Sequence, residues 1–159
     1  MHDLVFLIEK LYHQDLIEVD ITRGNLNPLP IAVSPLSIDN ESKQNFEKIL
    51  KKKNIGLEIS SVIENNLKIS GLFNPLNKDA FLQAPDIANL KPRFEDWNLI
   101  KAQALITGKV SFDNEKLRVE FRLWDVLAGK EMMALAFTTV PNNWRRVGHI
   151  ITDKVYERL

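Results

Sequence analysis

The fold of this 159-residue chain is decided by residues 104–140, which read ALITGKVSFDNEKLRVEFRLWDVLAGKEMMALAFTTV. Three strand-like runs lie in this stretch, at residues 104–110, 117–126 and 132–140. Between them stand Asp113-Asn114 and Ala128-Gly129, residue types that tolerate the backbone conformations of tight turns between antiparallel strands. The stretch therefore predicts an antiparallel meander of three strands.

Two helices are predicted beside this meander, because their apolar residues recur every three or four positions. The interior helix carries Ile55, Ile59, Val62, Ile63 and Leu67. Gly71 follows it and suits the left-handed residue that often ends a helix. The closing helix, preceded by Pro141, carries Trp144, Val147, Ile151, Val155 and Leu159.

Weaker patterns fill the rest of the chain. Residues 38–53 indicate a loop and a weak helix, and Pro92 is able to open a further short helix. Residues 29–33 are continuously apolar, which is typical of a strand inside a sheet. Residues 73–76 predict a short edge strand, because Pro75 cannot donate a hydrogen bond. Residues 77–89 are expected to be irregular.

These elements together predict an α/β (α+β) domain with a mixed sheet of about five strands and two to four helices packed on it. Residues 15–159 form this domain. Residues 1–14 are predicted to be an extra amino-terminal helix or a misassigned leader. Leu4, Leu7, Ile8, Leu11 and Tyr12 have helical spacing within residues 3–13, and Asp3 is available as a cap.

The composition excludes several classes of site. The chain has 21 basic and 21 acidic side chains and no cysteine, so disulfides, thiolate nucleophiles and sulfur-based zinc sites are absent. His149 and Asp153 have helical spacing, but neither a serine nor a second histidine stands convincingly nearby, and a surface pair is favoured. The six glycines are scattered singly, unlike a phosphate-binding loop. We expect no catalytic residues, no metal and no cofactor.

Two basic clusters offer a nucleic-acid hypothesis. Lys51-Lys52-Lys53 and Arg145-Arg146 could act together with Trp97, Trp124 and Trp144. The alternative is a solvated helix end and three core tryptophans. Zero net charge removes the general attraction to phosphate backbones, so we favour this alternative and expect no nucleic-acid partner.

One segment has a pattern suited to partner binding. Apolar Ile17, Val19 and Ile21 alternate with polar Glu18, Asp20 and Thr22. In an extended chain the two sets of side chains lie on opposite faces. Such a strand can add to the exposed sheet edge of a partner, although it can equally pair permanently within its own sheet.

Several strings in this order resemble the TolB amino-terminal domain family of the Tol-Pal envelope system. The resemblance covers about nine tenths of the chain, and it is carried by the meander together with residues 17–22, 29–33, 68–76 and 141–146. It implies an anticodon-binding-like fold. It also implies a non-enzymatic domain that docks on the TolA carboxy-terminal domain through Ile17, Glu18, Val19, Asp20, Ile21 and Thr22.

The resemblance further implies a periplasmic location and a role in outer-membrane integrity and constriction during cell division. We expect no secretory signal in residues 1–14 and no direct membrane insertion, because no apolar run approaches about 18 residues. The chain stops where the family's β-propeller would begin, so Pal, which binds the propeller, is not expected as a partner. A nucleic-acid module and a non-functional fragment of a longer TolB remain alternatives.

Overall fold

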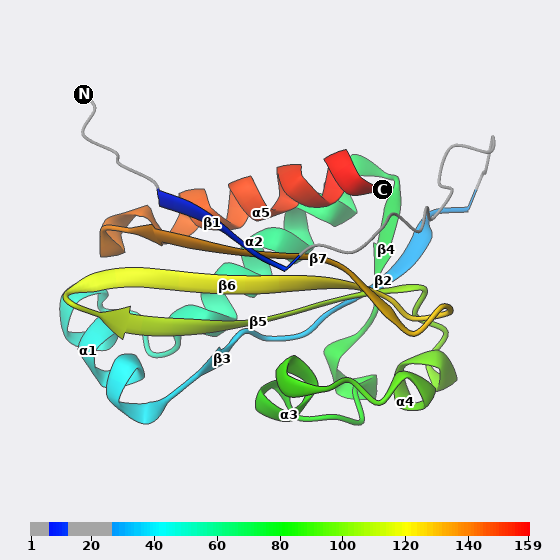
Figure 1. Cartoon of the computed structure of the whole chain (residues 1–159), viewed down its shortest axis with the longest axis horizontal. Helices are drawn as coiled ribbons and strands as arrows, with labels where there is room; N and C mark the ends of the chain where they lie inside the picture. Colours follow the sequence, from blue (N-terminus) through cyan, green and yellow to red (C-terminus); the bar gives the residue numbers. More distant parts are fainter. Residues whose placement is uncertain (1–6, 13–26) are drawn as a thin grey trace.

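A seven-stranded mixed sheet runs through the computed structural model, which describes residues 7–12 and 27–159 (Figure 1). Its main path has the order β1-β7-β6-β5-β2-β4, and β3 pairs with β5. The pairs β2–β4, β2–β5 and β3–β5 are parallel, and the other pairs are antiparallel. The strands are β1 (Leu7–Tyr12), β2 (Leu29–Val33), β3 (Ser37–Ile38), β4 (Phe73–Pro75), β5 (Ala104–Asp113), β6 (Lys116–Asp125) and β7 (Lys130–Thr139).

The helices lie on both faces of the sheet. They are α1 (Asn40–Leu50), α2 (Ile55–Ser70), α3 (Pro85–Leu90), α4 (Phe94–Leu99) and α5 (Trp144–Arg158), with short 3-10 turns η1 (Lys78–Ala80) and η2 (Pro141–Asn143). Helices α2 and α5 pack together against one face, whereas α3 and α4 cover part of the other (Figure 1). None of these helices is long and apolar enough to cross a bilayer, a finding limited to the described ranges.

The predicted meander is confirmed: β5 continues to Asp113, β6 and β7 begin earlier than predicted, at Lys116 and Lys130, and both end one residue sooner. Along β6, Leu117, Val119, Phe121 and Leu123 are fully buried, while the residues between them are half-buried. Gly108 in β5 allows the close approach of β6, because an added Cβ would collide with the backbone oxygen of Glu120. The meander is therefore a tightly packed unit in which one face belongs to the main core.

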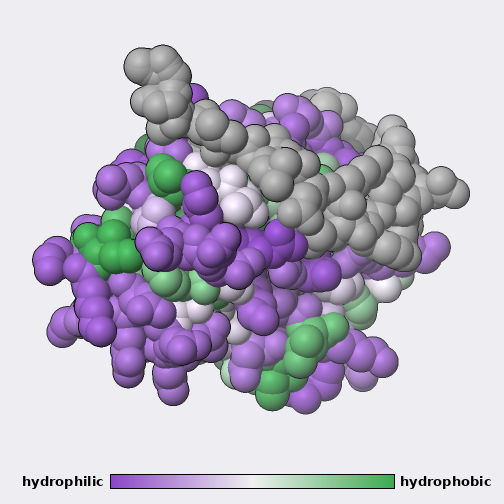
Figure 2. All heavy atoms as spheres, turned by 60° about the vertical axis from the view of Figure 1, so that its left-hand side comes forward, coloured by the Kyte–Doolittle hydropathy of each residue, from purple (hydrophilic) through white to green (hydrophobic). Residues whose placement is uncertain are grey.

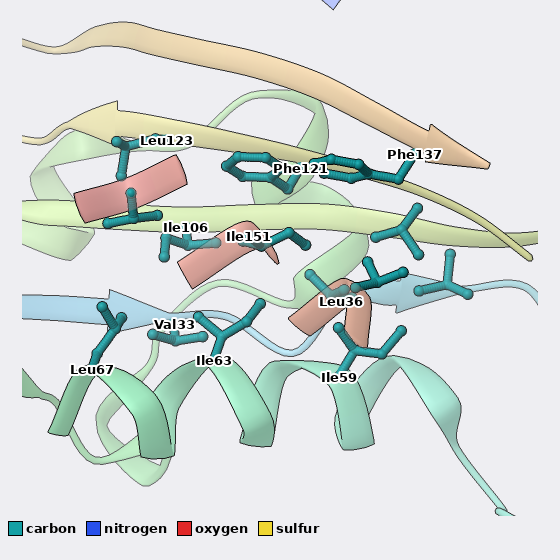
Figure 3. Close-up of a cluster of buried hydrophobic side chains, with 14 of the residues drawn as sticks. Val33, Leu36, Ile59, Ile63, Leu67, Ile106, Phe121, Leu123, Phe137 and Ile151 are labelled. Atoms are coloured by element: carbon teal, nitrogen blue, oxygen red, sulfur yellow. The ribbon is translucent and has the colours of Figure 1, made fainter. Parts of the chain in front are cut away.

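The main core lies between the sheet and helices α2 and α5. Ile59, Ile63 and Leu67 project from α2 toward Val33 and Ile106 (Figure 3). Asn54 caps the first turn of α2 by accepting a hydrogen bond from the Leu57 amide, and Gly71 ends the helix with a left-handed φ of 78°. The predictions for α2, α5 and the short edge strand β4 are confirmed.

A second, smaller core supports α3 and α4 on the opposite face. Trp97 is buried there against Phe81, with ring centroids 4.9 Å apart. The prediction that residues 77–89 are irregular is wrong in part, because they include η1 and the start of α3. Pro85 in the first turn of α3 has no amide hydrogen to leave unpaired, which explains why that helix begins there.

The helix predicted over residues 3–13 is wrong where the structure describes it. Residues Leu7–Tyr12 form strand β1, paired antiparallel with β7, with Leu7 opposite Thr138 and Tyr12 opposite Ala134. Without β1, one side of the ten-residue strand β7 would have no strand partner. Satisfying those backbone groups outweighs the helical spacing of the side chains. Together with β3, this strand enlarges the sheet beyond the predicted five strands.

Candidate partner-binding edge

The predicted docking residues Ile17, Glu18, Val19, Asp20, Ile21 and Thr22 lie outside the described residues, in the interval between β1 and β2. The structure defines the two strands that anchor this interval. The candidate site is therefore described through β1 and β2, the two strands that flank it, and through the edges of the sheet.

The anchor on the carboxyl side of the interval is strand β2. Ile31, Ala32 and Val33 are completely buried, and β2 is hydrogen bonded between β4 and β5. At its start, the Leu29 amide donates to the Leu72 carbonyl oxygen at 2.9 Å. An apolar strand that is buried and paired on both sides is a rigid mount.

The anchor on the amino side is β1 at the opposite side of the sheet. Strands β1, β7, β6 and β5 alternate in direction, and β2 runs parallel to β5. Strand β1 therefore runs toward the end of the sheet at which β2 begins, and its last residue, Tyr12, lies level with Thr107 of β5. Tyr12 and Leu29 are four strand spacings apart across the sheet, about 19 Å, and about 16 Å apart along the strands, which gives a separation of about 25 Å. The chain between these residues can reach about 56 Å when extended, which is about twice this separation.

The two sides of the sheet differ as templates for a partner strand. Strand β4 forms one side, and Pro75 leaves it without one of its amide donors. On the other side, β1 covers β7 along Leu7–Tyr12. Within the described part of the chain, the long central strands therefore have neighbours on both sides.

The titratable side chains of the described residues do not assemble into a recognisable catalytic arrangement. His149 Nδ1 lies 2.8 Å from Asn66 Nδ2 on the exposed surface between α5 and α2, so its partner is Asn66 and not the predicted Asp153. In the described ranges no group of three or more histidine, aspartate or glutamate residues could hold a metal ion. Ser42 Oγ donates to Asp39 Oδ2 at 2.9 Å and accepts from the Phe112 amide, so this hydroxyl–carboxylate pair is part of the cap of α1.

A row of charged side chains crosses the face of the sheet opposite the main core. Arg122 Nε lies 3.1 Å from Glu131 Oε1, and Glu120 lies 3.6 Å from Arg118 and 3.7 Å from Arg122. Burial raises the pKa of Glu131 above its usual value, and the nearby Arg122 guanidinium opposes this shift. These alternating charges neutralise one another, which is the ordinary state of half-buried polar strands.

A shallow pocket of about 260 Å³ lies where the α3 region meets the end of β2. It is lined by Pro35, Lys78, Phe81, Leu82, Gln83, Ala84 and Pro85. Lys78 Nζ is already paired with Glu64 Oε1 at 2.6 Å. The Gln83 amide is engaged by Lys91, Arg93 and Trp97. The polar groups of the pocket are therefore used within the fold.

The two basic clusters singled out in the sequence converge in space. Lys52 Nζ lies 5.8 Å from the ring centroid of Trp144, and Arg145 Cζ lies 4.7 Å from it. Of the three tryptophans predicted to lie in the core, Trp97 and Trp144 are buried, whereas Trp124 is only half-buried. Sequence spacing gave no sign of this convergence, which arises because α1 contacts η2.

Comparison with known proteins agrees with this architecture. The family model of the TolB amino-terminal domain matches residues 17–132. The Tol-Pal system protein TolB of Pelagibacter ubique (strain HTCC1062) is 80% identical over 156 residues, which is 98% of this chain and 35% of that protein. This chain therefore spans about a third of the length of that relative.

Two solved structures share the fold at low sequence identity. TolB from Acinetobacter baumannii has a TM-score of 0.64 and 18% identity, over 98% of this chain and 31% of that chain. A PelC dodecamer from Paraburkholderia phytofirmans has a TM-score of 0.57 and 16% identity, over 98% of both chains. The match to the family model covers most of the described sheet and helices. The chain belongs to the TolB amino-terminal domain family.

Proposed function

We propose that this chain is a non-enzymatic, periplasmic protein-interaction domain of the Tol-Pal system, which docks on the carboxy-terminal domain of TolA. The docking element is the alternating segment Ile17, Glu18, Val19, Asp20, Ile21 and Thr22. Through this contact the domain supports outer-membrane integrity and constriction during cell division. The single observation that carries the proposal is the 80% identity to a Tol-Pal system protein TolB over nearly the whole chain.

The geometry of the anchors supports docking by strand addition. Strand β2 is a rigid mount after the segment, and the interval from Tyr12 to Leu29, when extended, is about twice as long as the gap that it must bridge. Extra chain length lets residues 17–22 reach a partner while β1 and β2 stay in the sheet. In strand addition, backbone hydrogen bonds supply affinity, and alternate side chains select the partner. Ile17, Val19 and Ile21 would be buried, and Glu18 and Asp20 would face basic groups.

A titration of the 159-residue chain with a TolA carboxy-terminal domain tests this proposal. The substitution Val19→Pro removes an amide donor from the docking strand and should weaken binding at least tenfold. The matched control Val19→Thr keeps a β-branched residue and its amide, and should change affinity by only a few fold. Equal affinities of Val19→Pro and the unmodified chain would contradict strand docking.

A second titration tests the role of the acidic side chains. The double substitution Glu18→Gln and Asp20→Asn should weaken TolA binding, and its effect should shrink at high salt because screening removes the attraction in both forms. The control is the double substitution Glu157→Gln and Asp153→Asn, which alters the same number of charges on the exposed side of α5. Equal effects of the two double substitutions would assign the loss to net charge alone.

A further inference from the structure

We propose that the end of the domain formed by α1, the α1–α2 connection and the start of α5 binds the surface of anionic lipid bilayers. The site comprises Lys51, Lys52, Lys53 and Arg145, called the basic end below. It lies where β7 ends and η2 begins, whereas β2 begins at the other end of the sheet, and the proposal is independent of TolA docking.

The basic end is assembled by tertiary contacts between two distant parts of the chain. Lys51 caps α1 in a left-handed conformation with a φ of 60°, which turns the chain and places Lys52 over the Trp144 ring. Arg145 contacts the same ring from the first turn of α5. Trp144 is only 8% exposed and is held in the main core, so it fixes both cations on a rigid support.

The cations of the basic end have no acidic partner within the described part of the chain. Lys51, Lys52, Lys53 and Arg145 take part in none of the ion pairs formed among the described residues. Glu47 and Glu58 on the flanking helices likewise form no such pair. Cations that share one aromatic ring repel one another, and an anionic surface relieves this repulsion.

The polarity of the α5 start adds to the positive potential. The first turn of α5 contains no acidic residue, and Asn143 makes no side-chain cap hydrogen bond there. The amino-terminal end of a 15-residue helix carries a partial positive charge that falls off within the first turn. Arg145 thus lies at the positive end of a helix, where a bound anion would stabilise its charge.

Exposed apolar residues distinguish a bilayer from a nucleic acid as the occupant. Ile49 and Leu57 flank the lysine run in sequence and are 50% and 42% exposed. Figure 2 turns this end of the molecule toward the viewer, and small hydrophobic groups lie there within a hydrophilic surface. Basic residues beside exposed apolar residues suit the headgroup region of a membrane. Single-stranded nucleic acids need exposed aromatic rings for stacking, whereas Trp144 is buried.

Vesicle co-sedimentation of the 159-residue chain tests the proposal directly. The probes are phosphatidylcholine vesicles with about 30% phosphatidylglycerol, the same vesicles without it, and a single-stranded oligonucleotide. We expect binding to the anionic vesicles only, and we expect it to weaken as salt rises because the surface potential decays within a Debye length of about 10 Å at 0.1 M. Stronger binding to the oligonucleotide, or equal binding to neutral vesicles, would overturn the proposal.

A patch variant and a matched control locate the binding surface. The patch variant carries Lys51→Asn, Lys53→Gln and Arg145→Gln, and each lost cation should lower partitioning about fivefold, or about a hundredfold together. The control carries Lys101→Asn, Lys91→Gln and Lys130→Gln. Both variants lose three charges from exposed positions, and both replace one lysine of positive φ with asparagine. Equal losses in the two variants would show a net-charge effect and refute a localised site.

Two further measurements separate lipid binding from binding of free phosphate and from misfolding. Inorganic phosphate should compete with the vesicles no better than chloride at matched ionic strength, and selective competition would assign the basic end to free phosphate instead. Ile49→Gln with Leu57→Gln should reduce the binding that survives high salt, while Ile69→Gln with Leu90→Gln, at exposed sites elsewhere, should not. Unfolding midpoints of all variants show whether each remains folded.

Discussion

Gly148 in α5 lies directly against Val62 in α2. A Cβ atom at position 148 would lie 2.8 Å from Val62 Cγ1 and 2.9 Å from Val62 Cβ. One turn further along, Asn66 Nδ2 lies 3.4 Å from Thr152 Oγ1, so the two helices run in the same direction at close range. The absence of a side chain at Gly148 sets how closely the two helices of the main core approach.

The substitution Gly148→Ala is therefore expected to destabilise the domain, although alanine favours a helix. Alanine gains about 1 kcal/mol of helix propensity over glycine, whereas overpacking a core costs about 1–3 kcal/mol. We expect a net loss of about 1 kcal/mol in the free energy of unfolding, measured by urea denaturation. The double variant Gly148→Ala with Val62→Ala removes the clash. Its loss in the free energy of unfolding should therefore be smaller than the sum of the losses of the two single variants. Strict additivity would contradict the contact.

Gln83 is the polar centre of the second core, and its removal is expected to be costly. Its Oε1 accepts hydrogen bonds from Trp97 Nε1 and from the Arg93 amide, both at 2.9 Å. Gln83→Met keeps the volume but leaves these buried donors unpaired, at about 1–3 kcal/mol each. We expect a loss of about 2–4 kcal/mol in urea denaturation.

The control for this prediction is Gln44→Met on the exposed side of α1, which should change stability by no more than about 0.5 kcal/mol. Trp97→Phe removes one of the two donors, so Gln83→Met should cost less in that background than in the unmodified chain. An equal cost in both backgrounds would show that the Trp97 hydrogen bond contributes nothing.

Elements with a clear periodicity could be predicted from the sequence. In β6 every second residue is buried, and in α2 the buried apolar residues recur every three or four positions. Each pattern arises because one face of the element is buried, so the polarity of the side chains is enough to predict it. Strand β1 could not be predicted in this way. Its side chains have helical spacing, and the β7 edge that pairs with it exists only in the folded chain. Strand β3 is two residues long and leaves no periodic signal.

The candidate sites were predictable to different degrees. The docking segment at residues 17–22 is a pattern in the sequence and stays a prediction, because it lies outside the described residues. The basic end could be seen only as two separate clusters. Their convergence on Trp144 depends on the packing of α1 against η2, a contact between segments about 90 residues apart. Pairings at that separation do not follow from local patterns.

Glu131 is expected to make stability depend on pH in the weakly acidic range. Burial raises its pKa above 4.5 in the folded state, so the folded state binds a proton more readily than the unfolded state. The stability linked to this carboxyl group is fully present below pH 4.5 and is lost as pH rises through the raised pKa. As the pH rises from 4 to 7, the free energy of unfolding of Glu131→Gln, measured by denaturation, should increase relative to that of the unmodified chain. A constant difference would contradict the shift.

Asp39 is expected to act with the opposite sign at the start of α1. Its Oδ1 accepts a hydrogen bond from the Ser42 amide at 2.7 Å, and this bond holds the pKa of Asp39 below 3.8. A lowered pKa stabilises the folded state above pH 3.8, and that stability is lost as pH falls through the folded value. Asp39→Ala should cost about 1 kcal/mol at pH 7, and the cost should shrink toward pH 2. Asp39→Asn retains a cap acceptor without the charge, so its stability relative to Asp39→Ala should not vary with pH. If the Asp39→Ala cost stays the same from pH 7 to pH 2, the charge on Asp39 makes no contribution to the cap.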